Sequence, residues 1–351
     1  MALTRIQPPA IADVREPNFR NIIINGNMAV SQRGTSASSL TSTGYNTIDR
    51  WNMNIATGGT WTQSQSTDVP TGQGFATSLK MDCTTANSSL SAGSYFSLRQ
   101  KFEGQNLQYL KKGTSSAESL TCSFWVKSNK TGTYCVLLYD NDNTRVISKT
   151  ITISSADTWE QKEITFAGDT TGALGNDNAY SLGLEIILLA GTNYTSGTQA
   201  TSWESYTAAN IASDQTVNLA DSTSNEWYIT GVQLEAGSVA TDFEVVPYGQ
   251  NLERCQRYYI KISPKLNSVT GRGYQSSGAV IASRFQFPVF MRTEPTLGVA
   301  GTWAVQNLTG NPVASAFDES GFTLGATTSG AGDAYYYPDG ADDYLTASAE
   351  L

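Results

Sequence analysis

Aromatic and acidic side chains gather in the stretch DAYYYPDGADDYL at 333–345. A tyrosine ring offers rigid contact area with a hydrogen-bonding tip, and a carboxylate between such rings accepts hydrogen bonds from hydroxyl groups. Residues 318–351 hold seven acidic side chains and no lysine or arginine, so we expect this surface to repel anions. We therefore predict a surface that contacts a neutral or cationic glycan. Its contact residues would be Tyr335, Tyr336, Tyr337, Asp339, Asp342, Asp343 and Tyr344. The alternative is a strand, a turn and a strand at an interface between copies, with solvated aspartates in the turn.

A second candidate is the pair Trp203 and Glu204 in the stretch TSWESY. Sugar sites often combine an aromatic ring with a carboxylate. The ring face packs against C–H groups, and the carboxylate accepts hydrogen bonds from hydroxyls. The alternative is a tryptophan packed beneath its own loop.

Two acidic loops raise the question of bound calcium. In DNDN at 140–143, a calcium hand loop would require glycine at its sixth position and glutamate at its twelfth. Counted from Asp140, these positions hold Arg145 and Ile151, which favours a polar loop. GDTTGALGNDN at 168–178 is open to either a structural calcium or a plain turn cluster. Without histidine or a C-x-x-C motif we expect no zinc, and we assign no metal ligands and no cofactor.

We expect no enzymatic activity and assign no catalytic residues. The absence of histidine removes Ser–His and Cys–His nucleophile pairs. Neither of the two glycine-rich nucleotide-binding motifs, G-x-x-x-x-G-K-[ST] and G-x-G-x-x-G after a strand, is present. The 31 aspartates and glutamates leave room for the two carboxylates of a glycosidase, but no spacing nominates a pair. A polysaccharide depolymerase is therefore the least favoured alternative.

The charge of the chain limits its partners. The net charge is −9, which argues against nucleic acid and against an anionic membrane surface. No run of about 18 apolar residues occurs, so we expect no membrane insertion. The first residues carry no apolar core typical of a signal peptide, and we expect all four cysteines to be buried or half-buried thiols rather than disulfides.

The composition and the hydrophobic periodicity predict an all-β protein with two domains and a boundary near residue 250. Only 15% of residues are charged, and 31 glycines and 17 tyrosines suit short strands and many turns. The stretch 120–139 favours a hairpin, and 181–191 is apolar on both faces, as in a covered central strand. The stretch 251–261 predicts one helical turn that leads into a strand.

The stretch WYITGVQLEAGSVATDFE at 227–244 predicts a strand that ends in a glycine turn. Alternation places Gln233 and Glu235 on one face of this strand. A polar pair of this kind could contact a sugar, but we interpret it as the solvent or interface face of the closing strand.

Several motifs, taken in order, resemble those of bacteriophage tail-fibre and virion structural proteins. The motifs are NIIINGNMAVSQRGTS (21–36), Tyr45 with Asp49-Arg50-Trp51, FSLRQKFEGQNLQYLKKG (96–113), SFWVKSNKTGTY (123–134), TWEQKEITFAGDT (158–170), EWYITGVQLEAGSVATDFE (226–244) and CQRYYIK (255–261). The resemblance covers about residues 19–261, and residues 1–13 also resemble the particle-attaching start of such proteins.

The resemblance implies three parts. Residues 1–18 would form a short extended N-terminal arm that attaches to other tail or capsid proteins. Residues 19–250 would form a jelly-roll-like, carbohydrate-binding-like antiparallel β-sandwich, and residues 251–351 a smaller C-terminal β-sandwich domain that carries the recognition tip. The family also implies a homotrimer.

The resemblance further implies a phage virion fibre protein that binds a host surface polysaccharide or another receptor, located on the virion after synthesis in the host cytoplasm. The long shaft of such fibres is missing from this sequence. A head or tail decoration protein without receptor binding therefore stays open as the alternative.

Overall fold

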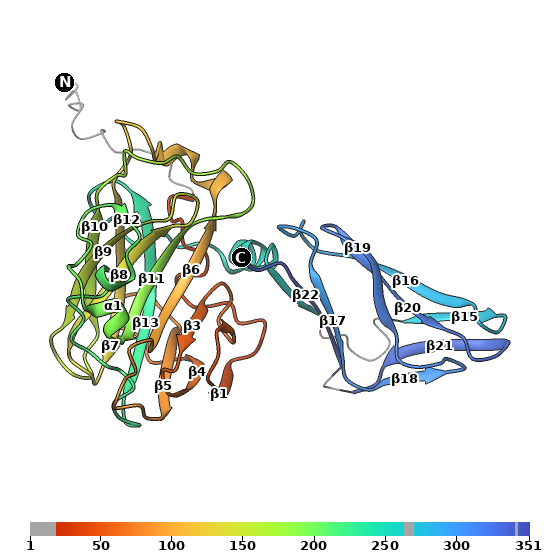
Figure 1. The fold of residues 1–351 in the computed structure, drawn as a ribbon. Coiled ribbons are helices and arrows are strands. Elements are labelled where there is room, and N and C mark those ends of the chain that lie inside the picture. Colours follow the sequence, from red (N-terminus) through yellow and green to blue (C-terminus); the bar gives the residue numbers. More distant parts are fainter. Residues whose placement is uncertain (1–18, 263–269, 341–342) are drawn as a thin grey trace, which may run out of the picture.

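The computed structural model describes residues 19–262, 270–340 and 343–351. Its regular structure is almost entirely β-strand with antiparallel pairing, which confirms the predicted all-β class. Figure 1 shows two β domains, with the helix α2 (Tyr248–Gln256) between them. The predicted arm at 1–18 lies outside the described residues. Within the described part of the chain, no helix is long and apolar enough to cross a membrane.

The first domain is a jelly-roll-like sandwich of two antiparallel sheets. The six-stranded sheet has the order β1 (Ser36–Leu40), β4 (Thr60–Ser66), β5 (Ser78–Thr85), β13 (Glu226–Ala236), β7 (Leu120–Ser128) and β10 (Glu160–Phe166). The seven-stranded sheet has the order β12 (Glu204–Ser205), β9 (Arg145–Ile153), β8 (Gly132–Asp140), β11 (Tyr180–Ala190), β6 (Tyr95–Glu103), β3 (Asn52–Ala56) and β2 (Gly44–Tyr45). Short helices lie in the connections: η2 (Gly104–Asn106), η3 (Gln108–Leu110), α1 (Thr192–Thr195) and η4 (Ala208–Asn210).

The core fills the space between the two sheets. Alternate residues of each strand point inward, as the period of two requires, and they include the fully buried Trp61, Phe96, Phe124 and Trp227. All four cysteines are buried and free, as predicted, and burial raises the pKa of Cys83 to about 11.

The predicted hairpin at 120–139 is wrong. Its two halves are strands, but β7 belongs to the six-stranded sheet and β8 to the seven-stranded sheet. Both strands are apolar on the core side. They face each other across the core, and the SNKTG turn crosses from one sheet to the other.

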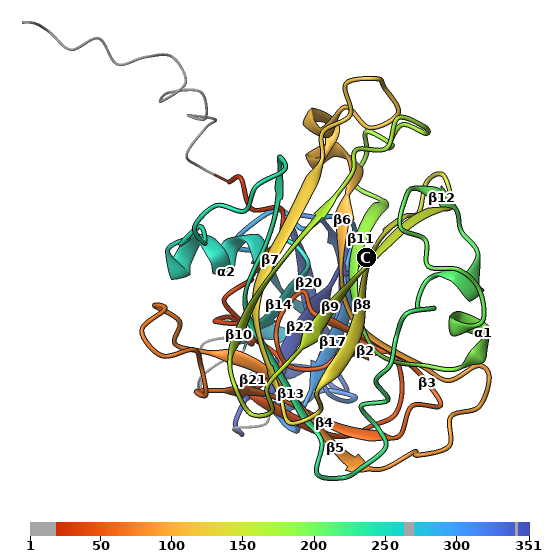
Figure 2. The same cartoon turned by 90° about the vertical axis from the view of Figure 1, so that its left-hand side faces the viewer.

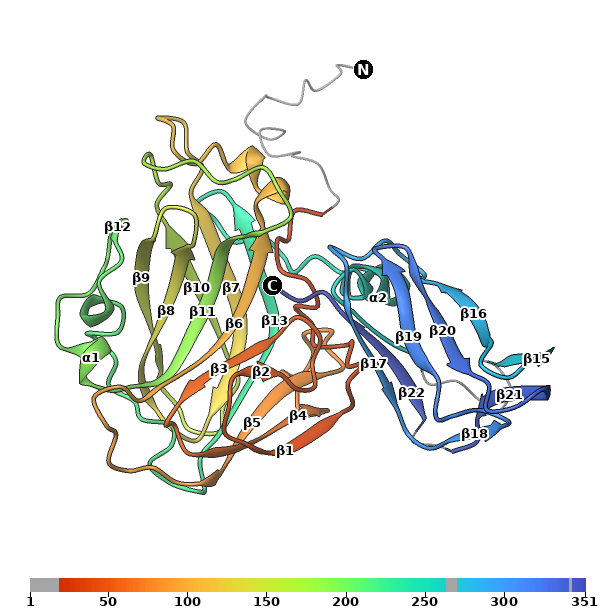
Figure 3. The same ribbon diagram turned by 45° about the vertical axis from the view of Figure 1, so that its right-hand side comes forward.

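The central strand β11 is buried on both faces, as predicted for 181–191. One face contacts the main core. The other carries a second cluster, with Cys135 and Ile187, beneath the segment that contains α1 and η4. Figures 2 and 3 show α1 and β12 on the side of β8 and β9 that faces away from β7 and β10. This outer face is therefore partly covered, and the covering segment forms one wall of a cleft.

The second domain encloses its own core with three three-stranded sheets. Their orders are β14 (Tyr259–Ile262), β22 (Tyr344–Ser348), β17 (Thr296–Ala300); β15 (Gly271–Gln275), β21 (Gly332–Pro338), β18 (Trp303–Gln306); and β16 (Val280–Gln286), β20 (Gly321–Thr327), β19 (Val313–Asp318). The first core runs to Leu234 and the second begins at Ile260, so α2 lies between them in sequence.

The Asp49-Arg50-Trp51 motif forms the junction between the domains. Arg50 is fully buried, pairs with Glu350 just after β22, and lies over the ring of Tyr258 at 3.5 Å. Arg33 pairs with the same Glu350 at 3.1 Å. Burial raises the pKa of Asp49 to about 6. This buried ion pair links the first domain to the end of the second.

Candidate functional site

A cleft of about 530 Å³ opens on the outer face of the seven-stranded sheet. We name it the tyrosine cleft, after the five tyrosines that line it: Tyr95, Tyr139, Tyr180, Tyr194 and Tyr206. Three charged side chains, Arg99, Lys101 and Glu185, lie among them.

Three adjacent strands build the floor of the tyrosine cleft. Tyr95, Arg99 and Lys101 alternate along β6 and so share its outer face. Glu185 of β11 pairs with Arg99 on one side and with Leu137 of β8 on the other. The floor is therefore polar in the middle of a sheet whose opposite face is the apolar core.

The walls of the cleft come from separate parts of the chain. Tyr194 comes from α1 and lies 4.8 Å from the ring of Tyr95. Tyr206 follows β12 and meets the ring of Tyr139 edge-on at 5.4 Å, and Tyr180 is 6.5 Å from Tyr139. The rings form a nearly continuous aromatic lining.

Glu185 is held in place by its neighbours. Its carboxylate accepts hydrogen bonds from the hydroxyl of Tyr95 at 3.0 Å and from Ser97 Oγ at 2.7 Å. The guanidinium of Arg99 lies 3.7 Å from it, and Arg99 Nε donates to Asn52 at 2.8 Å. The charge of Glu185 is thus compensated, and its bonds fix the Tyr95 hydroxyl and the Arg99 guanidinium.

Burial acts on the pKa of two of the tyrosine hydroxyls. Burial, and then the charge of Glu185, raise the pKa of Tyr95 well above its usual value, and burial raises the pKa of Tyr206 to about 12. Among the described residues, the hydroxyls of Tyr139, Tyr194 and Tyr206 have no hydrogen-bond partner. A neutral phenol both donates and accepts, so these groups are free to bind a polyhydroxylated ligand.

Lys101 connects the cleft to the second domain. Its ammonium donates to the backbone oxygen of Leu351 at 2.7 Å and lies 5.0 Å from the centre of the Tyr180 ring. Burial, and then the charge of Arg99, lower the pKa of Lys101 to about 8. One end of the cleft therefore contacts Leu351, which follows β22 (Tyr344–Ser348).

The residues of the predicted DAYYYPDGADDYL surface do not lie together on one exposed face, because successive side chains of a strand alternate. Tyr336 was predicted to contact a glycan, but it is fully buried, and its hydroxyl donates to the backbone oxygen of Leu324 at 2.6 Å. Asp343 is also buried, and its carboxylate accepts from the backbone N–H of Asp339 and Gly340. These two assignments are corrected: one residue belongs to the core and the other closes a turn.

The other residues of that stretch differ in position. Tyr335 and Tyr337 lie on the outer face of β21, with their rings stacked at 5.6 Å and 25°, so each ring covers one face of the other. Asp339 is exposed, whereas the half-buried Tyr344 lies on β22 with the ammonium of Lys261 4.4 Å from its ring. Asp342 lies outside the described residues.

Trp203 and Glu204 do not line the tyrosine cleft. Trp203 Nε1 donates to the backbone oxygen of Ala167 at 2.7 Å, and Glu204 accepts from Asn210 at 2.8 Å. The tryptophan is partly buried against the core and contacts Ala167 and Lys112, which matches the alternative of a packed ring. Tyr206, two residues further on, is the cleft residue of this stretch.

Gln233 and Glu235 are not on a solvent face. Both are buried, they are hydrogen-bonded to each other at 2.8 Å, and Thr241 donates to Glu235. The segment that follows β13 folds over them, so their alternation reflects a covered polar layer.

In the two acidic loops, at 140–143 and 168–178, cationic side chains pair with carboxylates. Lys112 pairs with Asp140 and lies 2.9 Å from Asp169, and Arg145 pairs with Asp169 at 2.8 Å. In the part of the chain that the structure describes, no group of three or more acidic, cysteine or histidine side chains could hold a metal ion.

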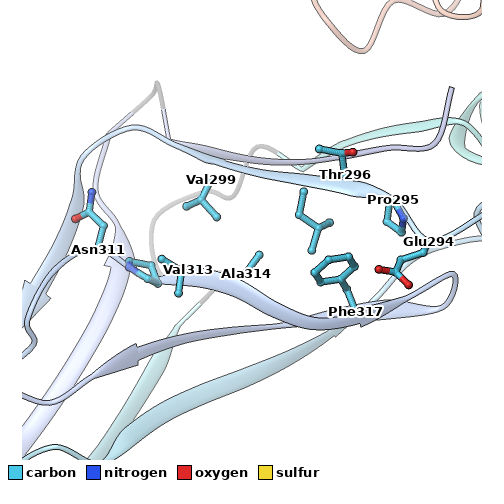
Figure 4. A pocket seen from close by; sticks show the side chains of 10 residues that line it. Glu294, Pro295, Thr296, Val299, Asn311, Val313, Ala314 and Phe317 are labelled. Atoms are coloured by element: carbon cyan, nitrogen blue, oxygen red, sulfur yellow. The ribbon is translucent and has the colours of Figure 1, made fainter.

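A separate apolar groove of about 750 Å³ lies in the second domain between β17 and β19. Figure 4 shows Val299, Val313 and Phe317 around the space between the two strands. Each strand is at the edge of its sheet, and Val313 is 63% exposed. Unpaired edges beside exposed apolar residues favour pairing with another chain.

Sequence reasoning missed the tyrosine cleft because its five tyrosines come from well-separated parts of the chain. One local signal was available. Glu185 interrupts the otherwise apolar stretch SLGLEIILLAG, and a carboxylate in a strand covered on both faces needs partners.

No family model matches this chain, and no curated protein matches it. A solved structure of the enzymatically active domain of bacteriophage CBA120 tailspike protein 4 aligns with 13% identity and a TM-score of 0.32, over 63% of this chain and 22% of that chain. TmCBM61 in complex with β-1,4-galactotriose aligns with 10% identity and a TM-score of 0.31, over 62% and 99% of the two chains. A family 11 carbohydrate-binding module from Clostridium thermocellum aligns with 12% identity and a TM-score of 0.28, over 59% and 98%. Scores of this size assign no function, so the function must be argued from the cleft.

Proposed function

We propose that the tyrosine cleft binds a saccharide of a cell surface. The observation that carries this proposal is the set of aromatic rings with free hydroxyls around a polar floor. Ring faces pack against the C–H groups of a sugar, and hydroxyls exchange hydrogen bonds with it. The cavity volume of about 530 Å³ lies within the usual range for sites of small ligands.

The cleft is suited to binding rather than to cleavage. Glycoside hydrolysis by the common route needs two carboxylates on either side of the bond, and Glu185 is the one carboxylate among the residues that line the cleft. Its carboxylate is already occupied by two hydrogen bonds and by the guanidinium of Arg99. We propose a binding protein without catalytic activity.

We further propose that the chain is a phage virion fibre protein that binds a host surface polysaccharide. Support comes from the ordered motifs at 19–261, one of which, Asp49-Arg50-Trp51, forms the junction of the two domains. Attachment to other virion proteins through residues 1–18 is part of this proposal, and so is location on the tail or capsid surface. A decoration protein without receptor binding is the alternative.

The homotrimer is also proposed, with the groove between β17 and β19 as the contact between copies. A second copy would cover Val313 and Phe317 and pair with a free strand edge. Three copies of a weak site would gain avidity from their effective concentration on one cell surface.

The test is adsorption of the fluorescently labelled full-length protein to a panel of bacteria. Three proteins are compared: the wild type, Tyr139→Ala in the cleft, and the double variant Tyr335→Ala with Tyr337→Ala on the second domain. We expect Tyr139→Ala to abolish adsorption and the double variant to retain it. The opposite pattern would move recognition to the second domain. Adsorption of no protein to any cell of a panel that contains hosts would favour the decoration protein.

A further inference from the structure

A second cavity lies on the opposite sheet of the sandwich. It has a volume of about 400 Å³ and opens on the outer face of the six-stranded sheet. We name it the Trp125 groove. The side chains that line it include Trp125, Phe75, Phe243, Gln73, Gln161 and Asp242.

The strands place one tryptophan at the base of the groove. Trp125 lies on the outward-facing side of β7, opposite Gln161 of β10 and Thr230 of β13. Its neighbours Phe124 and Val126 point into the core. The alternation of β7 therefore turns Trp125 away from the core, where it is half-buried and not fully covered.

A glycine on β13 makes room for the aromatic wall. Gly231 has a φ of 63°, at the point where the pairing with β7 shifts register. A Cβ at this position would lie 2.5 Å from the ring of Phe75, so only glycine leaves the ring its place. Phe75 in turn meets Phe243 edge-on at 5.2 Å, which joins two loops into one apolar wall.

Four polar side chains of the groove are unpaired, whereas its Thr77 and Thr241 are hydrogen-bonded. Among the described residues, Trp125 Nε1, the amides of Gln73 and Gln161, and the carboxylate of Asp242 have no hydrogen bond or ion pair. Trp159, which immediately precedes β10 and lies beside Tyr228 of β13, differs in this respect, because its Nε1 donates to Asp68 at 3.0 Å and Lys127 pairs with the same Asp68. The polar groups around Trp159 are thus bonded to each other, whereas the four named groups of the groove are free.

From this contrast we propose that the Trp125 groove is a second saccharide site, selective for neutral sugars. Its aromatic rings offer faces to C–H groups, and its amides and carboxylate match hydroxyl donors. No lysine or arginine lines the groove, and Asp242 is its one charged lining residue, so an anionic sugar would be repelled. The tyrosine cleft contains the cationic side chains of Arg99 and Lys101, so it does not repel an anionic sugar in this way.

The test is titration calorimetry of the full-length protein with cellotetraose, chitotetraose and β-1,4-galactotriose as neutral probes and tetragalacturonate as the acidic probe. The variants are Trp125→Ala and Gln161→Ala. Trp159→Ala is the matched control, because it removes a side chain of the same type next to β10 but outside the groove. Circular dichroism and thermal melting establish that each variant is folded.

We expect at least one neutral probe to bind the wild type, and its affinity to fall about tenfold or more in Trp125→Ala, as at aromatic hot spots. Gln161→Ala should weaken the same binding, while Trp159→Ala leaves it unchanged. Unchanged binding by Trp125→Ala and Gln161→Ala, or no binding of any neutral probe by the wild type, would overturn the second site. A change of oligomeric mass in Trp125→Ala with no loss of sugar binding would instead make the groove a contact between copies.

The same titrations distinguish saccharide binding in the Trp125 groove from saccharide binding in the tyrosine cleft. Loss of binding in Tyr139→Ala alone supports the cleft and not the groove, and loss in Trp125→Ala alone supports the groove and not the cleft. If both sites bind the same probe, the wild type shows two sites, and each variant shows one.

Discussion

Glu185 and Arg99 lie directly opposite each other on β11 and β6, with the guanidinium 3.7 Å from the carboxylate on the floor of the tyrosine cleft. Glu185 is buried in a strand that is otherwise apolar. A buried charge is stable only when it is paired and hydrogen-bonded, and Tyr95, Ser97 and Arg99 provide those contacts here. This relationship organises the floor of the cleft.

Replacement of Glu185 should therefore be costly for stability. Glu185→Gln keeps the size of the side chain but removes the charge that Arg99 and two hydroxyls contact. We expect the free energy of unfolding to fall by about 1–3 kcal/mol, as when a buried group loses its partner. Chemical denaturation measures this. Glu163→Gln, an exposed residue of β10, is the matched control, and an equal loss in both variants would contradict the account.

The domain junction gives a second prediction. Glu350→Gln leaves Arg50, which is fully buried, without the carboxylate that compensates its charge. Removal of one partner of a buried pair costs about 3–5 kcal/mol, so we expect an earlier thermal transition in calorimetry. Glu319→Gln, on the exposed surface of the same domain, should leave the temperature of the thermal transition unchanged. If Glu350→Gln unfolds at the same temperature as the wild type, the Arg50–Glu350 pair does not stabilise the contact between the domains.

The junction should also respond to pH through Asp49. Burial raises the pKa of Asp49 to about 6 in the folded chain, above its usual value of 3.8. The folded chain then binds the proton more tightly than the unfolded chain, so this group stabilises the fold as pH falls from about 6 to about 4, and the contribution is lost as pH rises through 6. We expect Asp49→Asn to remove this dependence. Denaturation of both proteins at pH 4, 5, 6 and 7 measures the difference, and parallel pH profiles would refute the assignment.

Association of copies gives a fourth prediction. Val313→Asp places a charge in the apolar groove between β17 and β19, and a buried unpaired charge opposes association. We expect the wild type to have the mass of a trimer in light scattering and Val313→Asp to have the mass of a monomer. Val280→Asp, at a similarly exposed valine outside the groove, is the control. A monomeric wild type would end the proposal for this contact.

The sequence predicted the class of fold well because alternation and turn residues are local signals. The stretch 181–191 is apolar on both faces and became the covered strand β11. The same alternation does not tell to which sheet a strand belongs, so 120–139 was predicted as a hairpin although β7 and β8 lie in different sheets.

Part of the predicted glycan surface is misplaced for a related reason. Three consecutive tyrosines on a strand cannot all face outward, since the side chains alternate, and Tyr336 is the one that fills the core. Gln233 and Glu235 likewise obeyed alternation, but a later segment covers them. The tyrosine cleft could not be found from local patterns, because its tyrosines meet only after the sheet and its covering segment have formed.

The most direct test of the central claim is the affinity of the tyrosine cleft for saccharides. Purified surface polysaccharides and the four oligosaccharide probes are titrated into the wild type, Tyr139→Ala, Tyr206→Ala and Tyr274→Ala, of which Tyr274 is an exposed tyrosine of the second domain. We predict that a saccharide binds the wild type and Tyr274→Ala equally and binds each cleft variant about tenfold or more weakly. Equal binding by all four proteins would contradict the account, and so would a loss confined to Tyr274→Ala.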